Sequence, residues 1–216
     1  MPSASELDAV TLDAMGTLVE LVDPVEPLGA ALRERGVEKS PEDVRAAFAA
    51  EVAYYITHAH EGRDEASLRE LGRSCAGVFL RHLGAELDAA EFAPAFVDSL
   101  RFQPLEGVPA ALATLRRAGL SLACVSNWDV SLSDQLARTE LAQSLDAVVS
   151  SAEARAPKPA PDAFHLALGR LGVLAERALH VGDGQADEEG AAAAGARFEP
   201  APLATLPERL GLRTRS

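Results

Sequence analysis

The chain has 216 residues, of which 48% are hydrophobic and 25% charged, and its formal net charge is -13. This length allows one well-filled core, or a core domain with one small inserted domain, and it excludes a long series of domains. The negative charge repels phosphate backbones and anionic membrane surfaces, which excludes both as expected partners.

The start of the chain and its two cysteines indicate the compartment. The segment MPSASELDAV has no basic stretch followed by an apolar one, so we expect no signal peptide and a cytoplasmic protein. Cys75 and Cys124 fall in segments assigned to different domains, which predicts two reduced core thiols and neither a disulfide nor a metal site.

The expected partner is a small-molecule substrate, with no nucleic acid and no membrane, and the protein is expected to be a monomer or homodimer.

Three short apolar runs end abruptly in polar or small residues, which is typical of buried parallel strands with functional groups at their carboxyl ends. Helical patterns separate the runs, and Gly119 and Gly172 stop two of these helices. Alternation of strand and helix predicts an α/β fold, a doubly wound, Rossmann-like parallel sheet that binds ligands at the carboxyl ends of its strands. The predicted strands are residues 9–12, 120–125 and 178–181, and the predicted helices are residues 107–118 and 161–171.

About a hundred residues between the first and second predicted strands have helical periodicity and no convincing strand pattern. Ser40 followed by Pro41 predicts an N-cap and first turn of one helix, because a hydroxyl can accept from a free amide there and proline needs no donor. We therefore predict an all-helical cap domain over residues 19–98, inserted into a core domain of residues 1–18 and 99–216.

Acidic, hydroxyl and basic groups follow the predicted strands in a fixed order. Asp13 follows the first strand, Ser126 ends the second, Lys158 lies in a later loop, and Asp183 and Asp187 follow the third strand. One aspartate before a turn is usually a turn former, and an aspartate at a helix start usually caps the helix. All five residues in this order are a more specific signal than any one of them. Lys158 is also one of only two lysines in the chain.

These motifs, in this order, resemble those of the haloacid dehalogenase-like hydrolase superfamily over nearly the whole chain. The similarity extends to the subfamily with an Asp-Ala-hydrophobic-Gly-Thr-Leu first motif, a Ser-Asn-aromatic-Asp second motif and a helical cap. The resemblance implies that Asp13 is the nucleophile, that Ser126 donates to a phosphoryl oxygen and that Lys158 neutralises charge. It also implies that Asn127, Gly16 and Thr17 bind substrate. The implied Mg²⁺ ligands are Asp13, the backbone carbonyl of Met15 and Asp183, with Asp187 in the second shell or bound through water.

The charges of these residues indicate a cation independently of the resemblance. Asp13, Asp183 and Asp187 would place three negative charges against the single positive charge of Lys158 in a small cleft. Such a group cannot stay ionised without a further cation. The sequence therefore predicts a divalent metal ion.

Met15 departs from the usual phosphatase motif, which has an aspartate two residues after the nucleophile to protonate the leaving group. A thioether donates no proton, and general acid catalysis contributes about 10²- to 10⁴-fold in rate. A phosphatase acting on a small phosphorylated metabolite with a good leaving group is the favoured function. Two alternatives stay open: a 2-haloacid dehalogenase-like hydrolase, because halide departure needs no acid, and a non-catalytic binding or regulatory protein.

Overall fold

The computed structural model describes residues 4–212, which form two compact units. One unit contains the described residues up to Glu20 and those from Gln103 onward, and the other is Leu21–Phe102. The sequence prediction divided the chain after residues 18 and 98. That the helical unit acts as a cap over a catalytic site stays a prediction. None of the described helices is long and apolar enough to cross a membrane.

The first unit is built on a five-stranded sheet of order β5-β4-β1-β6-β7, in which every neighbouring pair is parallel. The central strand β1 is buried along its whole length, as its continuous apolar sequence requires. This confirms the predicted α/β fold and all three predicted strands. The strands are β1 (Ala9–Leu12), β4 (Ser121–Ser126), β5 (Ala147–Ser150), β6 (Ala178–Gly182) and β7 (Arg197–Pro200).

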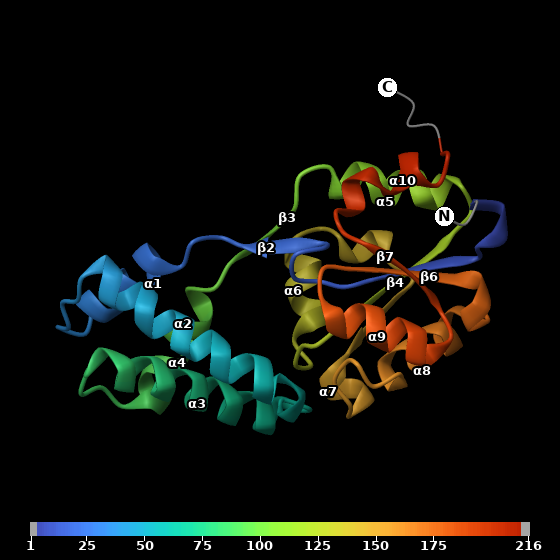
Figure 1. Ribbon diagram of the computed structural model, residues 1–216. Helices are drawn as coiled ribbons and strands as arrows, with labels where there is room; N and C mark the ends of the chain where they lie inside the picture. Colours follow the sequence, from blue (N-terminus) through green and yellow to red (C-terminus); the bar gives the residue numbers. More distant parts are fainter. Residues whose placement is uncertain (1–3, 213–216) are drawn as a thin grey trace. The chain divides into compact units, whose positions relative to one another are not determined.

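Helices cover both faces of this sheet (Figure 1). On one face, α8 and α9 bury Phe164 and Ala191 against Ala123 and Val125 of β4 and neighbouring apolar residues. On the other face lie α5 and α10 (Figure 1). The helices of this unit are α5 (Val108–Arg117), α6 (Leu132–Arg138), α7 (Ser151–Ala154), α8 (Asp162–Leu171), α9 (Gln185–Ala194) and α10 (Leu206–Arg209).

The second unit is a helical bundle with its own core, in which Phe79, Phe92 and Phe96 are almost completely buried and their rings contact one another. The side chain of Ser40 accepts a hydrogen bond from the amide of Asp43, which confirms the predicted N-cap. The helices are α1 (Val25–Arg33), α2 (Pro41–His58), α3 (Glu65–Leu83) and α4 (Ala89–Asp98).

The prediction that no strand lies between the first two core strands was wrong. Strands β2 (Val19–Leu21) and β3 (Phe102–Pro104) pair as a separate two-stranded sheet where the chain passes between the units. Each has only three residues, too few for an alternating pattern to stand out against the helical periodicity around it. Both cysteines are buried, reduced thiols, as predicted.

Candidate active site

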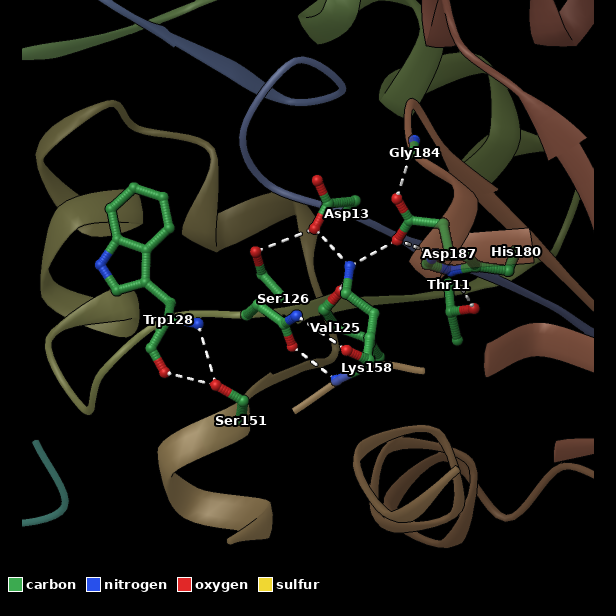
Figure 2. A network of polar contacts seen from close by, with 11 residues as sticks. Thr11, Asp13, Val125, Ser126, Trp128, Ser151, Lys158, His180, Gly184 and Asp187 are labelled. Carbon is green, nitrogen blue, oxygen red and sulfur yellow. Dashed lines mark hydrogen bonds and ion pairs between the residues drawn. The ribbon is translucent and has the colours of Figure 1, made fainter. Parts of the chain in front are cut away.

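The carboxyl ends of β1, β4 and β6 bring together side chains that are far apart in the sequence (Figure 2). Asp13 directly follows β1, Ser126 is the last residue of β4, and Lys158 lies in the loop between α7 and α8. The backbone amide of Asp13 donates to the carbonyl of Val181 in β6 over 2.9 Å, so the sheet pairing continues to this residue. The sheet therefore fixes the starting point of the Asp13 side chain.

One oxygen of the Asp13 carboxylate is held by two donors. Oδ1 accepts from Ser126 Oγ over 2.9 Å and from Lys158 Nζ over 2.6 Å, and the residue is buried. Figure 2 shows the other carboxylate oxygen directed away from both donors. Such an arrangement fixes the rotamer of the carboxylate and leaves one oxygen oriented for a different task, such as attack or metal binding.

The ammonium group of Lys158 is buried between two carboxylates. Its Nζ donates to Asp13 Oδ1 over 2.6 Å, to Asp187 Oδ1 over 2.5 Å and to the carbonyl of Val125 over 3.1 Å. Burial on its own would lower the pKa of Lys158, but the attraction of Asp13 and Asp187 outweighs it and raises the pKa above its ordinary value. Lys158 is therefore a fixed positive charge beside Asp13.

Asn127 fixes the backbone of Lys158. Its Nδ2 donates to the Lys158 carbonyl over 3.1 Å, and its Oδ1 accepts from the Lys158 amide over 2.7 Å. This two-point pairing ties the end of β4 to the loop that carries the lysine, and it gives Asn127 a positioning role that the sequence did not suggest. Its predicted contact with a substrate stays a prediction. One residue further on, the amide of Trp128 donates to the hydroxyl of Ser151, and that hydroxyl donates to the carbonyl of Trp128.

Three carboxylates form a candidate metal centre. Asp13, Asp183 and Asp187 each offer an oxygen, and these oxygens lie within 4.8 Å of one another. Asp183 is exposed, but its pKa is raised because neighbouring protein atoms remove part of the water around the carboxyl and because Asp13 and Asp187 repel its negative charge. The three residues carry three negative charges against the one of Lys158, which is the charge excess that a divalent cation would balance.

The turn after Asp13 allows Asp183 to come close. Gly16 has φ +76°, and a Cβ at this position would lie 2.1 Å from Asp183 Oδ2, so a residue with a side chain does not fit. The amide of Gly16 donates to the carbonyl of Val19, and the hydroxyl of Thr17 is buried without a hydrogen-bond partner among the described residues. The predicted contact of both residues with substrate stays a prediction.

Met15 lies in the same turn, where it forms an isolated bridge with Val19, and the residue is 38% exposed. A thioether has no proton to give; that Met15 stands where a phosphatase has its general acid stays a prediction.

Asp187 occupies a different environment from Asp183. Its Oδ1 accepts from Lys158 and, over 2.9 Å, from His180 Nε2, while its Oδ2 accepts from the amide of Gly184 over 3.1 Å. Burial on its own would raise the pKa of Asp187, but the bonds from His180 and Lys158 lower it to about 2. These bonds hold the Asp187 carboxylate against Lys158 and His180; its predicted role at the metal, as an outer residue or as a ligand through water, stays a prediction.

Sequence reasoning missed His180 and its partner Thr11. Both lie inside apolar runs and were taken only as strand residues, yet His180 Nδ1 lies 3.0 Å from Thr11 Oγ1. The available signal was a single histidine inside the otherwise apolar strand that precedes Asp183 and Asp187, since a buried polar group needs a partner.

Comparison with known proteins identifies the family that this site fits. A model of the haloacid dehalogenase-like hydrolase family matches residues 7–195. Haloacid dehalogenase-like hydrolase domain-containing protein 3 of Bos taurus is 43% identical over 95 residues, which are 44% of this chain and 38% of that protein. A phosphoglycolate phosphatase of Cupriavidus necator is 41% identical over 90 residues, 41% of this chain and 39% of that protein. The matches thus span less than half the length of these curated relatives.

Among solved structures, L-2-haloacid dehalogenase from Xanthobacter autotrophicus with chloropropionic acid covalently bound is similar over 97% of this chain and 85% of that chain. The sequence identity is 27% and the TM-score 0.65. The fold and the family match thus both agree with a known hydrolase family.

Proposed function

The chain belongs to the haloacid dehalogenase-like hydrolase family, and we propose that it is a Mg²⁺-dependent phosphatase that acts through an aspartyl-phosphate on Asp13. The observation that carries this proposal is the cluster of Asp13, Asp183 and Asp187, two of which, Asp13 and Asp187, form ion pairs with the buried Lys158. The similarity to a phosphoglycolate phosphatase over part of the chain supports phosphoryl chemistry.

The residues of the cluster fit Mg²⁺. Carboxylate and carbonyl oxygens are the ligands that this ion prefers, and it commonly uses only one or two protein carboxylates. Asp13, Asp183 and the backbone carbonyl of Met15 would hold it, and Asp187, which contacts Lys158, would lie outside these ligands or bind the ion through water. When bound, the ion would neutralise the excess negative charge and act as a Lewis acid on the phosphoryl oxygens.

Asp13 would act as the nucleophile in two steps. In the first, its outward-directed oxygen attacks phosphorus, a bond from that oxygen to phosphorus forms and the bond to the leaving oxygen breaks. In the second, water attacks phosphorus and the bond to Asp13 breaks, which releases phosphate and restores the carboxylate. The contacts of Ser126 and Lys158 with Asp13 Oδ1 support a role for both donors in stabilising phosphoryl oxygens.

Met15 narrows the class of substrate. Without a proton donor at this position, an alkoxide leaving group loses the general-acid contribution of about 10²- to 10⁴-fold, or roughly 3 to 5 kcal/mol of activation free energy. Acyl and aryl phosphates have weakly basic leaving groups that depart without protonation. We therefore place the substrate among small phosphorylated metabolites with such a leaving group.

A second candidate is haloacid dehalogenation. It is favoured by the 27% identity to a 2-haloacid dehalogenase across most of both chains and by an apolar residue at position 15, since halide needs no acid. Against it stands the second carboxylate, because Asp183 near Asp13 would repel a carboxylate substrate when no cation is bound.

The test is a paired substrate screen, with acetyl phosphate, an aryl phosphate, an alkyl phosphate and 2-chloropropionate, each with and without Mg²⁺. The proposal expects Mg²⁺-dependent turnover of the first two, slow turnover of the alkyl phosphate, and loss of all turnover in Asp13→Asn. Turnover of 2-chloropropionate alone, without Mg²⁺, would establish the second candidate instead. No turnover of any substrate would favour a binding or regulatory protein.

A further inference from the structure

A buried row of polar groups extends behind Lys158, and the proposed chemistry does not use it. Thr11 Oγ1 lies 3.0 Å from His180 Nδ1, and His180 Nε2 lies 2.9 Å from Asp187 Oδ1. The same Asp187 oxygen accepts from Lys158, which contacts Asp13 (Figure 2). We infer that His180, oriented by Thr11, is a positioning residue that holds Asp187 and thereby keeps the Lys158 ammonium on Asp13. Its effect on turnover rests on the proposed function.

The register of the sheet builds this row. Thr11 of β1 and His180 of β6 are direct partners across the parallel pair. Because side chains alternate along a strand, Thr11 shares a face of the sheet with Asp13, and His180 shares one with Gly182. A Cβ on Gly182 would lie 2.3 Å from Asp187 Cγ. The missing side chain of Gly182 thus leaves the space in which the Asp187 carboxylate meets His180.

The hydrogen bonds of the row run in one direction. An ionised carboxylate can only accept, so Nε2 of a neutral His180 carries the proton and donates to Asp187. Nδ1 must then accept, and the hydroxyl of Thr11 supplies that proton. Asp187 thus sets the ring tautomer, and the hydroxyl of Thr11, which can donate or accept, donates to Nδ1 and holds the ring in this orientation.

Packing holds the imidazole in this position. The His180 ring is completely buried, and it meets the Phe164 ring edge to face with centroids 4.7 Å apart and planes at 82°. A buried ring packed in this way has no room to exchange its partners for water. Loss of the Nε2 bond would leave Asp187 Oδ1 with Lys158 as its remaining donor, and the carboxylate could then rotate and draw the ammonium away from Asp13.

The two lysines of the chain allow this inference to be tested without any substrate. Protein labelled with ¹⁵N-lysine gives one side-chain signal for Lys158 and one for Lys39, which lies in the other unit. We expect the Lys158 ammonium protons to exchange slowly with water in the wild type. In His180→Met and in Thr11→Val this exchange should become faster and the Lys158 signal should shift, while the Lys39 signal stays unchanged. His165→Met, on exposed α8 surface, is the matched control and should leave both signals unchanged.

Kinetics on an aryl phosphate supplies the second readout. We expect His180→Met and Thr11→Val to lower kcat by about 10- to 100-fold, as second-shell changes commonly do, with little change in KM. His180→Gln, which keeps a donor toward Asp187, and Thr11→Ser, which keeps the hydroxyl, should each recover most of the loss. Thr11→Val also keeps the side-chain shape, so it carries the test if His180→Met does not fold.

The outcomes separate the positioning role from the proposed function. If the Lys158 signal and its exchange rate are the same in Thr11→Val as in the wild type, the positioning role is wrong. It is also overturned if His180→Gln and Thr11→Ser lose as much activity as the apolar variants. If the Lys158 signal responds as expected but no phosphate ester is turned over, the positioning role stands and the proposed function fails.

Discussion

Glu51 gives the helical unit a stability that depends on pH. It lies on the buried stripe of α2 with Val44 and Ala47 and is 3% exposed. Burial raises the pKa of Glu51 from 4.5 to about 7, and a hydrogen bond from Cys75 opposes the shift only in part. Below pH 4.5 the carboxyl is neutral in both the folded and the unfolded chain, so it has no net effect.

Above that pH the unfolded chain releases the proton while the folded chain keeps it. Folding therefore becomes less favourable as the pH rises, until the folded carboxyl also ionises near its pKa of about 7. At about 1.4 kcal/mol for each unit of pKa, the shift corresponds to roughly 3 kcal/mol of unfolding free energy lost over this range. Glu51→Gln removes the titration, so this loss should be absent in the variant.

The assay is urea unfolding at several pH values, followed by tyrosine absorbance. Tyr54 and Tyr55 are the only tyrosines and both lie in the helical unit, whereas Trp128 reports on the other unit. Near pH 4.5 we expect Glu51→Gln and the wild type to have the same unfolding free energy. Above neutral pH the unfolding free energy of Glu51→Gln should be larger by roughly 3 kcal/mol. Glu38→Gln, on an exposed loop, is the control and should follow the wild type. If the unfolding free energies of the wild type and Glu51→Gln change in parallel with pH, the reasoning is refuted.

Three further predictions concern the candidate site. Gly16→Ala should weaken Mg²⁺ binding, measured by calorimetry, and lower the unfolding free energy by about 1 to 3 kcal/mol, because the new Cβ would lie 2.1 Å from Asp183 Oδ2 at a φ of +76°. An unchanged Mg²⁺ affinity would contradict the close approach of Asp183 to this turn. Mg²⁺ at 100 times its Kd should stabilise the wild type by about 2.7 kcal/mol in thermal unfolding, and Asp183→Asn should abolish that gain; an equal gain in both proteins would place the ion elsewhere. Met15→Asp should raise turnover of alkyl phosphates selectively, by up to about 10²-fold, and leave aryl phosphates little changed; an equal change for both substrates would show that leaving-group protonation is not the limit.

The sequence predicted the centre of the sheet better than its edges. Strands β1, β4 and β6 are buried apolar runs that end in functional residues, and both features can be read locally. Strand β1 is as short as the edge strands β5 and β7, but all four of its residues are buried, whereas two residues of β5 and none of β7 are. The edge strands were missed because this incomplete burial left little apolar pattern in their sequences. Strands β2 and β3 depend on their mutual pairing, which no local pattern encodes.

For the site, the sequence identified the charged residues, because strand ends in a parallel sheet meet at one edge. It could not predict which atoms pair there. The amide of Asn127 bonds the backbone of Lys158, and Gly16 is required by the close approach of Asp183. The contact of Thr11 with His180 follows from the register of β1 against β6, and register is a property of the assembled sheet.

The fate of solvent oxygen during turnover tests the central claim most directly. Hydrolysis in H₂¹⁸O with an aryl phosphate and Mg²⁺ should place ¹⁸O in the released phosphate and none in the peptide that contains Asp13, because water attacks phosphorus in the second step. An ester formed with a haloacid would instead be hydrolysed at the carboxyl carbon of Asp13. The account predicts labelled phosphate and an unlabelled Asp13 peptide, and ¹⁸O in the Asp13 carboxylate after turnover would contradict it.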